Sequence, residues 1–332
     1  MTKDEVKNLF AGFSEYTIMV IGDVMIDSYL WGKVERISPE APVPVVLGLQ
    51  RENRLGGAAN VALNLQALGA LPVLVSVIGE DANTQNFFQL LEKSNLPSNG
   101  ILTNQNRKTT IKTRIIAAHQ HLLRIDEETE NNLDKHTQIQ FIDHITELLK
   151  EKKFHAIIFE DYDKGVITEE VIEKVVQLAK EIGIPTLVDP KKRNFMFYRD
   201  VTLFKPNFKE LTEGLKLEIG KGDLPAIHEA SMKLRKLLNI QYSLITLSEH
   251  GIFINKENSY LSIPAEVRDI ADVSGAGDTV ISIACVCLVS GLSPEHLATI
   301  CNLGGGLVCE RVGVVPIDKI HLEKEVLRYF ST

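Results

Sequence analysis

The stretch DVSGAGDTV (272–280) brings together residue types that can handle a charged group. Gly275 and Gly277 leave the backbone bare just before an apolar segment (281–288) that is typical of a buried helix, although glycine costs a helix about 1 kcal/mol relative to alanine. The free N–H groups of a first helical turn bind anions, and the helix dipole favours negative charge there. Asp278 would lie at the rim of such a site, where a carboxylate can take a proton from a hydroxyl that attacks phosphorus. The alternative is a tight turn in which Asp278 only complements the helix dipole.

Two further stretches offer what phosphoryl transfer also needs, a magnesium-organising acid and a pocket for the acceptor hydroxyl. KPNFKE (205–210) follows a strand-like VTLF and places Asn207 and Glu210 on one face of a helix start, with a plain helix cap as the alternative. GGAAN (56–60) places two glycines and Asn60 at another helix start. Neither GxxxxGK[ST] nor GxGxxG after a strand occurs, which argues against a P-loop NTPase and a dinucleotide-binding dehydrogenase.

Apolar runs that end in acidic or glycine residues recur along the chain and predict buried strands. They lie at 17–27, 71–81, 155–165, 184–194 and 242–251. Helical periods lie between them at 60–69, 168–183 and 225–238. This alternation predicts an α/β fold with a doubly wound, mostly parallel sheet flanked by helices. Ligands of such sheets bind beyond the carboxyl ends of the strands, where the acidic and glycine residues gather.

Two β-rich stretches, 42–53 and 109–126, interrupt the alternation because no helix separates their strands. They predict a small antiparallel sheet that projects from the main domain as a lid. We expect a single domain over 1–332 with lid insertions at about 30–55 and 109–126. Edge strands of the main sheet are the alternative.

The composition limits the classes of partner. The 332 residues are 44% hydrophobic and carry a net charge of −8, which fits a soluble globular protein and argues against general nucleic-acid or membrane-surface binding. The N-terminal MTKDEVKNLF lacks an apolar signal core, and the nearly uncharged run 280–292 is shorter than the roughly 20 residues that span a bilayer. We therefore expect a cytoplasmic protein. Its cysteines form no C-x-x-C and fit buried reduced thiols: Cys285, Cys287, Cys301 and Cys309.

Two signatures resemble the ribokinase-like (PfkB) carbohydrate kinases. LGGAANVALNLQALGALPVLVSVIG (55–79) is similar to the first and DVSGAGDTVIS (272–282) to the second, in the expected order. The second departs from the family at Ile283 and Cys285, which concerns packing rather than chemistry. The resemblance implies a ribokinase-like fold and transfer of phosphoryl from ATP, with Mg²⁺, to a sugar or sugar phosphate. It leaves open whether a monovalent cation is also required.

The resemblance also implies roles for the matched positions. The catalytic base is Asp278, and the anion hole is Gly275, Ala276 and Gly277. The nucleotide set is Asn207, Glu210, Thr246, Ser248, Glu249, Gly251 and Asn302. The metal set is Glu210 and, through water, Asp189.

The sugar set implied by the resemblance is Asp23, Asp27, Gly56, Gly57 and Asn60. Asp23 has a turn cap as its alternative, and the glycines have a tight strand–helix junction as theirs. Basic residues expected to hold the phosphate already on the substrate are Lys112, Arg114, Arg124, Lys164 and Lys191. Each of these has a solvated surface charge as its alternative.

Further stretches resemble the heptose 7-phosphate kinase group of this family over about residues 5–325: 22–46, 160–165, 188–195, 205–210 and 246–251. This implies phosphorylation of the anomeric hydroxyl of D-glycero-β-D-manno-heptose 7-phosphate to the 1,7-bisphosphate, for ADP-heptose and lipopolysaccharide synthesis. Bifunctional relatives carry a C-terminal nucleotidylyltransferase domain, and this sequence ends at Thr332 without one, so a stand-alone kinase is expected.

Departures from that group occur at Ala118-His119, which bears on the sugar phosphate, and at Gly313-Val314, near the expected adenine site. The alternatives are another sugar or sugar-phosphate kinase of the family, of ribokinase or 6-phosphofructokinase type, and a non-catalytic sugar or nucleotide sensor on the same fold.

An isolated small sheet leaves an edge and an apolar face uncovered. In the PfkB family the lid of one subunit often packs on that of another, so the resemblance implies a homodimer joined through the lid sheets. The alternative is a monomer whose lid folds onto its own core.

Overall fold

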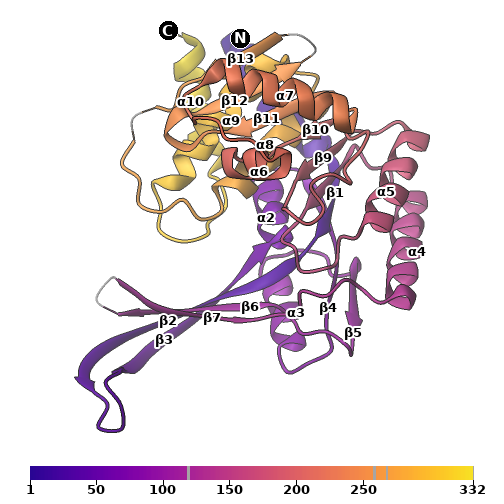
Figure 1. Ribbon diagram of the computed structural model, residues 1–332. Coiled ribbons are helices and arrows are strands. Elements are labelled where there is room, and N and C mark those ends of the chain that lie inside the picture. The colour runs from indigo at the N-terminus through magenta and orange to yellow at the C-terminus, as the bar shows by residue number, and fades with distance from the viewer. Residues whose placement is uncertain (118–119, 257–258, 267, 332) are drawn as a thin grey trace.

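The computed structural model describes residues 1–117, 120–256, 259–266 and 268–331. The strands of its main sheet are β1 (Thr17–Gly22), β4 (Leu71–Gly79), β5 (Ile101–Asn104), β8 (Ala156–Glu160), β9 (Thr186–Asp189), β10 (Leu203–Phe204), β11 (Tyr242–Thr246), β12 (Ile252–Lys256) and β13 (Ser259–Ile263). They lie in the order β13-β12-β11-β10-β9-β8-β1-β4-β5 (Figure 1). The pairs from β11 through β5 are parallel, and β12 and β13 add antiparallel strands at one edge. The predicted mostly parallel α/β sheet is confirmed.

Helices cover both faces of this sheet. One face carries α1 (Lys3–Gly12), α2 (Ala58–Leu68), α3 (Thr84–Lys93), α8 (Ala276–Val289), α9 (Pro294–Cys309) and α10 (Lys319–Ser331). The other carries α4 (Lys135–Glu151), α5 (Glu169–Ile182), α6 (Phe208–Leu215) and α7 (Leu224–Leu238). Because side chains alternate along a strand, Ile18 and Val20 of β1 pack into the first core and Met19 and Ile21 into the second. Strands buried on both faces explain the continuous apolar runs in the sequence.

A second sheet extends away from the main body as a long arm (Figure 1). It consists of β2 (Val24–Ile37), β3 (Pro44–Gly57), β6 (Ile111–Ala117) and β7 (Gln120–Glu127), in the order β3-β2-β6-β7. The prediction of a separate small sheet is confirmed, and its description as antiparallel holds for the pairs β2–β3 and β6–β7 but not for the central pair. β2 and β6 pair in parallel, from Ile26 with Ile111 onwards, because both strands run outward from the body. The role of this sheet as a lid stays a prediction.

The cysteine prediction is confirmed: Cys285, Cys287, Cys301 and Cys309 are buried and form no disulfide. Among the described residues, no helix has both the length and the apolar character needed to cross a membrane. Ala118 and His119, where the sequence departs from the heptose kinase group, lie outside the described residues.

Candidate active site

Acidic side chains from two strand ends and one helix start meet at the carboxyl edge of the main sheet. Glu160 ends β8 and pairs in register with Asp189 at the end of β9, so both side chains lie on the same face of the sheet. The first turn of α8 packs over these strands and adds Asp278. Each of the three offers a carboxylate oxygen, and these oxygens lie within 4.8 Å of one another. Acidic residues therefore gather at the carboxyl ends of the strands, as the sequence predicts. We call Glu160, Asp189 and Asp278 the acidic cluster.

Asp278 is 4% exposed and is held by two hydrogen bonds. The Asn60 amide donates to Oδ2 at 2.6 Å, and the Tyr162 hydroxyl donates to Oδ1 at 2.9 Å. Burial raises the pKa of Asp278 to about 6, against the opposite effect of the Asn60 hydrogen bond. A carboxylate with this pKa is ionised at neutral pH and is better matched to proton transfer than an ordinary aspartate. The Asn60 side chain, predicted in the sugar set, is bonded to the predicted base.

The glycines ahead of Asp278 are required by close contacts. Gly275 has φ +80°, and a Cβ there would lie 3.0 Å from the Asn60 amide nitrogen. A Cβ on Gly277 would lie 3.4 Å from Asp189 Oδ2 and 3.5 Å from Lys205 Nζ. The backbone of the first turn of α8 therefore approaches charged groups of the sheet edge closely, as a bare helix start permits. Whether Gly275, Ala276 and Gly277 form an anion hole stays a prediction.

Sequence reasoning missed two members of this site, Glu160 and Lys205. Glu160 is fully buried, and neither of its carboxylate oxygens has a hydrogen-bond partner among the described residues. Burial, followed by the charges of Asp189 and Asp278, raises its pKa well above the usual value. The Lys205 ammonium, 2% exposed, lies 2.7 Å from Asp189 Oδ2. Glu160 is the last residue of a short apolar strand and Lys205 directly follows another, which is the signal that could have identified them.

The predicted nucleotide and magnesium residues meet at the start of α6. Asn207 is its N-cap, and Asn207 and Glu210 accept each other's backbone N–H at 2.8 Å. These bonds form a capping box that fixes both side chains in place, and the role of the two residues toward nucleotide and magnesium stays a prediction. The other Glu210 oxygen accepts a hydrogen bond from Lys191 Nζ at 2.6 Å, and this ammonium lies 3.9 Å from Asp189. Lys191, predicted as a phosphate ligand, thus connects Glu210 to the acidic cluster.

The rest of the predicted nucleotide set is more dispersed. Thr246 ends β11 and forms an isolated bridge with Asn207. Ser248 and Glu249 lie in a short 3-10 turn before Gly251, and Glu249 pairs with Lys221 at 2.9 Å. Asn302 of α9 donates to the Pro264 carbonyl at 2.8 Å. In the described part of the chain, no hydrogen bond joins Glu249 or Asn302 to the acidic cluster.

Asp27 lies on β2, 3% exposed, and forms an ion pair with Arg114 of β6. A Cβ on Gly56 would collide with the Asp27 carboxylate. Gly57 has φ +61°, and a Cβ there would meet the Asp23 carbonyl. The two glycines therefore form the tight strand–helix junction that leads into α2, and they leave room for Asp27. Their contact with a sugar stays a prediction.

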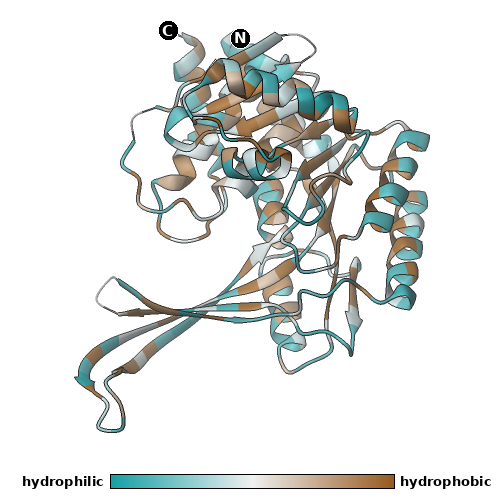
Figure 2. Cartoon of the chain, viewed as in Figure 1, coloured by the Kyte–Doolittle hydropathy of each residue, from teal (hydrophilic) through white to brown (hydrophobic). Residues whose placement is uncertain are grey.

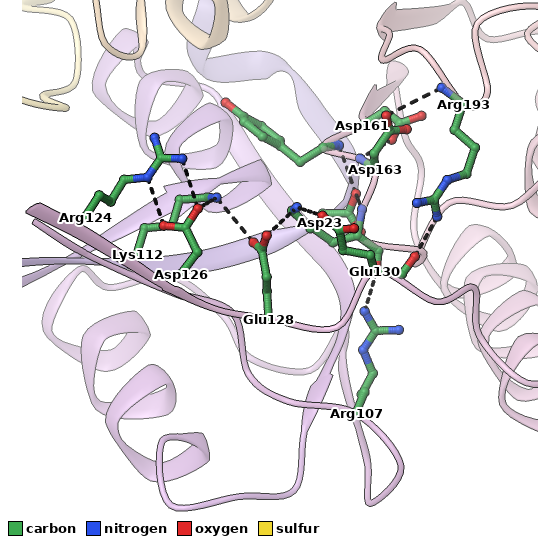
Figure 3. A network of polar contacts seen from close by, with 12 residues as sticks. Asp23, Arg107, Lys112, Arg124, Asp126, Glu128, Glu130, Asp161, Asp163 and Arg193 are labelled. Atoms are coloured by element: carbon green, nitrogen blue, oxygen red, sulfur yellow. Dashed lines mark hydrogen bonds and ion pairs between the residues drawn. The ribbon is translucent and has the colours of Figure 1, made fainter.

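The remaining predicted phosphate ligands already have carboxylate partners (Figure 3). Lys112 lies 3.3 Å from both Asp126 and Glu128, and Arg124 lies 2.9 Å from Asp126. Lys164 lies 2.7 Å from Glu128 and also pairs with Glu130. Lys112 and Lys164 are therefore not the solvated surface charges of the alternative interpretation. A substrate phosphate would have to compete with these acids for them.

Comparison with known proteins shows the family of the chain. A family model described as pfkB family carbohydrate kinase matches residues 16–319. The chain is 39% identical over 317 residues, 95% of its length, to the bifunctional protein HldE of Magnetococcus marinus. It is 38% identical over 323 residues, 97% of its length, to the protein of the same name from Methylobacillus flagellatus. The chain spans 65% of the length of each of these relatives.

Two solved structures have the same fold. Phosphofructokinase-2 from Escherichia coli in complex with potassium superimposes with a TM-score of 0.77 at 16% identity, covering 96% of this chain and 99% of that one. Ribokinase from Arabidopsis thaliana, complexed with ribose and ATP, has a TM-score of 0.71 at 16% identity, covering 93% and 99%. At this identity the similarity shows a shared architecture.

Proposed function

Because the chain belongs to the pfkB family of carbohydrate kinases and is an ATP-dependent sugar kinase, we propose that its acceptor is the anomeric hydroxyl of D-glycero-β-D-manno-heptose 7-phosphate. The product is the 1,7-bisphosphate. The observation that carries the phosphoryl-transfer chemistry is Asp278, a buried carboxylate held by two donors at a bare helix start. The choice of sugar is supported by the stretches EDYDKG (160–165) and VDPKKRNF (188–195), which resemble heptose 7-phosphate kinases.

Asp278 accepts the proton of the anomeric hydroxyl as its oxygen attacks the γ-phosphorus of ATP. The new O–P bond forms while the bond to the ADP oxygen breaks, and ADP leaves with the electron pair. The backbone N–H groups of Gly275, Ala276 and Gly277 then stabilise negative charge on the transferred group. Water is excluded by the second sheet, if that sheet acts as the lid expected from the sequence.

The residues at this edge of the sheet fit Mg²⁺. Carboxylates are the hard oxygen ligands that Mg²⁺ prefers, and the two unpartnered oxygens of buried Glu160 are available for one. Glu160, Asp189 and Glu210 would hold the ion, and Lys191 and Lys205 offset part of their charge. When bound, Mg²⁺ neutralises charge on the phosphates of ATP.

We further propose that the kinase acts in ADP-heptose synthesis for lipopolysaccharide, in the cytoplasm where ATP and sugar phosphates are available. The relatives reported above are called bifunctional, and this chain spans 65% of their length. The match therefore supports one of their two activities, the kinase, for this chain.

The second sheet supports the proposal of a homodimer. Its strands expose large apolar side chains, and Figure 2 colours hydrophobic residues along the arm brown. They are Val34, Ile37, Leu47, Leu49, Leu122, Leu123 and Ile125. Leu123, 56% exposed, would be covered by a second copy. Light scattering should give a dimer for the wild type and for Ile320→Glu, an exposed control on α10, and a monomer for Leu123→Glu. A wild-type monomer at micromolar concentration contradicts the homodimer.

The substrate proposal is tested by measuring ADP release across a panel of acceptors. We expect heptose 7-phosphate to give the highest kcat/KM, well above ribose and fructose 6-phosphate. A higher kcat/KM with either of those two identifies a different sugar kinase of the family. ATP binding without turnover on any acceptor favours a sensor.

A further inference from the structure

One carboxylate, that of Asp23, accepts three backbone N–H groups of the loop that follows β8, residues 161–166 (Figure 3). Asp23 Oδ2 accepts the backbone N–H groups of Tyr162 at 2.9 Å and Lys164 at 3.1 Å. Its Oδ1 accepts the N–H of Val166 at 3.1 Å. Asp23 is 1% exposed, so these bonds replace the water that an exposed carboxylate would have. The turn-cap alternative for Asp23 therefore describes its contacts better than the sugar set does.

The loop that Asp23 holds carries Tyr162 to the predicted base. The Tyr162 hydroxyl donates to Asp278 Oδ1 at 2.9 Å, across 116 residues of sequence. A cation also lies over the ring, since Lys191 Nζ is 5.4 Å from the ring centroid. The same ammonium bonds Glu210. Tyr162 thus contacts both the predicted base and the lysine that connects the base region to the α6 start.

We infer that Asp23 and Tyr162 are positioning residues for the base: Asp23 fixes the loop, and the Tyr162 hydroxyl fixes the orientation of the Asp278 carboxylate. This inference rests on the proposed function. A carboxylate that is held on both oxygens, by Asn60 on one and Tyr162 on the other, keeps a fixed plane toward the acceptor hydroxyl. Loss of one donor lets it rotate, and misplacement of a reacting group by about 1 Å can cost up to about 10²-fold in rate.

Tyr198 is a matched control for Tyr162, because its hydroxyl bonds a carboxylate that does not belong to the acidic cluster. The Tyr198 hydroxyl donates to Asp161 Oδ2 at 2.7 Å and is fully buried against Phe159 and Phe204. Asp161 lies in the same loop as Tyr162. Tyr198→Phe therefore removes a similar bond from a neighbouring place without altering the donors to Asp278.

The first experiment compares Tyr162→Phe with Tyr198→Phe in the full chain. We expect Tyr162→Phe to lower kcat about 10-fold, the effect of one hydrogen bond to a charged group, with the KM for sugar and for ATP changed less than about twofold. Tyr198→Phe should lower the melting temperature and leave kcat within about twofold. Equal kcat losses in the two variants, or a Tyr162→Phe kcat within about twofold of wild type, overturn the inference.

The second experiment combines Asp23→Asn with Tyr162→Phe. If Asp23 acts through Tyr162, the kcat of the double variant equals that of the slower single variant. If Asp23 is instead a sugar ligand, Asp23→Asn raises the sugar KM and the two losses multiply, which overturns its part of the inference. Should Asp23→Asn fail to fold, the tyrosine comparison decides alone.

A third measurement is independent of turnover. A crystal structure of Tyr162→Phe without substrate should show the Asp278 carboxylate rotated from its wild-type plane. An unchanged carboxylate overturns the inference even if no acceptor is ever found. Absence of turnover by the wild type on every acceptor contradicts the proposed function and leaves this structural outcome to be judged separately.

Discussion

Replacing Asp278 by asparagine removes a buried negative charge but keeps the shape of the side chain. The new amide can also keep both hydrogen bonds, because its oxygen can accept from the Asn60 amide and its nitrogen can donate to the Tyr162 hydroxyl oxygen. A base and a residue that merely complements the helix dipole respond to this change in opposite ways. For a base, turnover falls and stability rises. For a dipole partner, stability falls and turnover is kept.

The size of the stability gain follows from the pKa of Asp278. Its rise from 3.8 to about 6 corresponds to about 3 kcal/mol, at roughly 1.4 kcal/mol per unit. Since the folded state holds this proton more tightly than the unfolded state, the free energy of unfolding falls as the pH rises from 3.8 to about 6. The ionised Asp278 carboxylate therefore destabilises the folded state fully at pH 8 and not at all at pH 3. Asp278→Asn should therefore raise the free energy of unfolding by up to about 3 kcal/mol at pH 8 and leave it unchanged at pH 3.

Urea denaturation at the two pH values measures this gain, and calorimetry checks that ATP still binds. Turnover of the same variant should fall by about 10²–10⁴-fold, the usual contribution of a general base. Asp134→Ala is a suitable control, because Asp134 caps α4 far from the site in sequence and its pKa is lowered to about 2, chiefly by the Thr137 backbone N–H. That variant should lose stability and keep turnover. Near-normal turnover of Asp278→Asn, or a lower stability at pH 8, refutes the reasoning.

Three further outcomes are expected. The acidic limb of the kcat/KM profile should fall near pH 6, since Asp278 must be ionised to accept a proton, and a limb near pH 4 argues against it. Gly56→Ala should raise the sugar KM at least about 10-fold, because the new Cβ collides with Asp27. Gly12→Ala, which has open space around it, should leave the KM unchanged, and equal KM values in the two variants contradict the role of Asp27. Glu160→Gln should raise the Mg²⁺ concentration needed for half-maximal activity, and an unchanged Mg²⁺ dependence removes Glu160 from the metal set.

The strand ends could be predicted from the sequence, because apolar runs fix where a buried strand stops and parallel strands end at the same edge. This rule puts Asp189 at the edge of the sheet, where the structure has it, and it also reaches Glu160 and Lys205, which the sequence analysis does not single out. The bond from Tyr162 to Asp278 could not be predicted, because it joins positions 116 residues apart and depends on how Asp23 holds the loop that carries Tyr162. No local pattern encodes such a contact.

The second sheet was also predictable only in part. Its existence follows from residue types, but the parallel pairing of β2 with β6 depends on the direction in which each strand leaves the body. The sequence contains one indication of the ion pairs at the base of this sheet. Asp126, Glu128 and Glu130 recur with period two, so an extended chain presents them on one face, where Lys112 and Lys164 meet them.

The measurement that tests the central claim most directly is the position of the transferred phosphoryl group. Heptose 7-phosphate labelled with ¹⁸O at the anomeric oxygen is incubated with ATP, Mg²⁺ and the full chain, and the product is analysed by ³¹P NMR. The account predicts a 1,7-bisphosphate whose new phosphorus signal carries the ¹⁸O isotope shift, formed by the wild type and lost in Asp278→Asn. An unlabelled new phosphate, phosphorylation at another hydroxyl, or equal product from Asp278→Asn contradicts it.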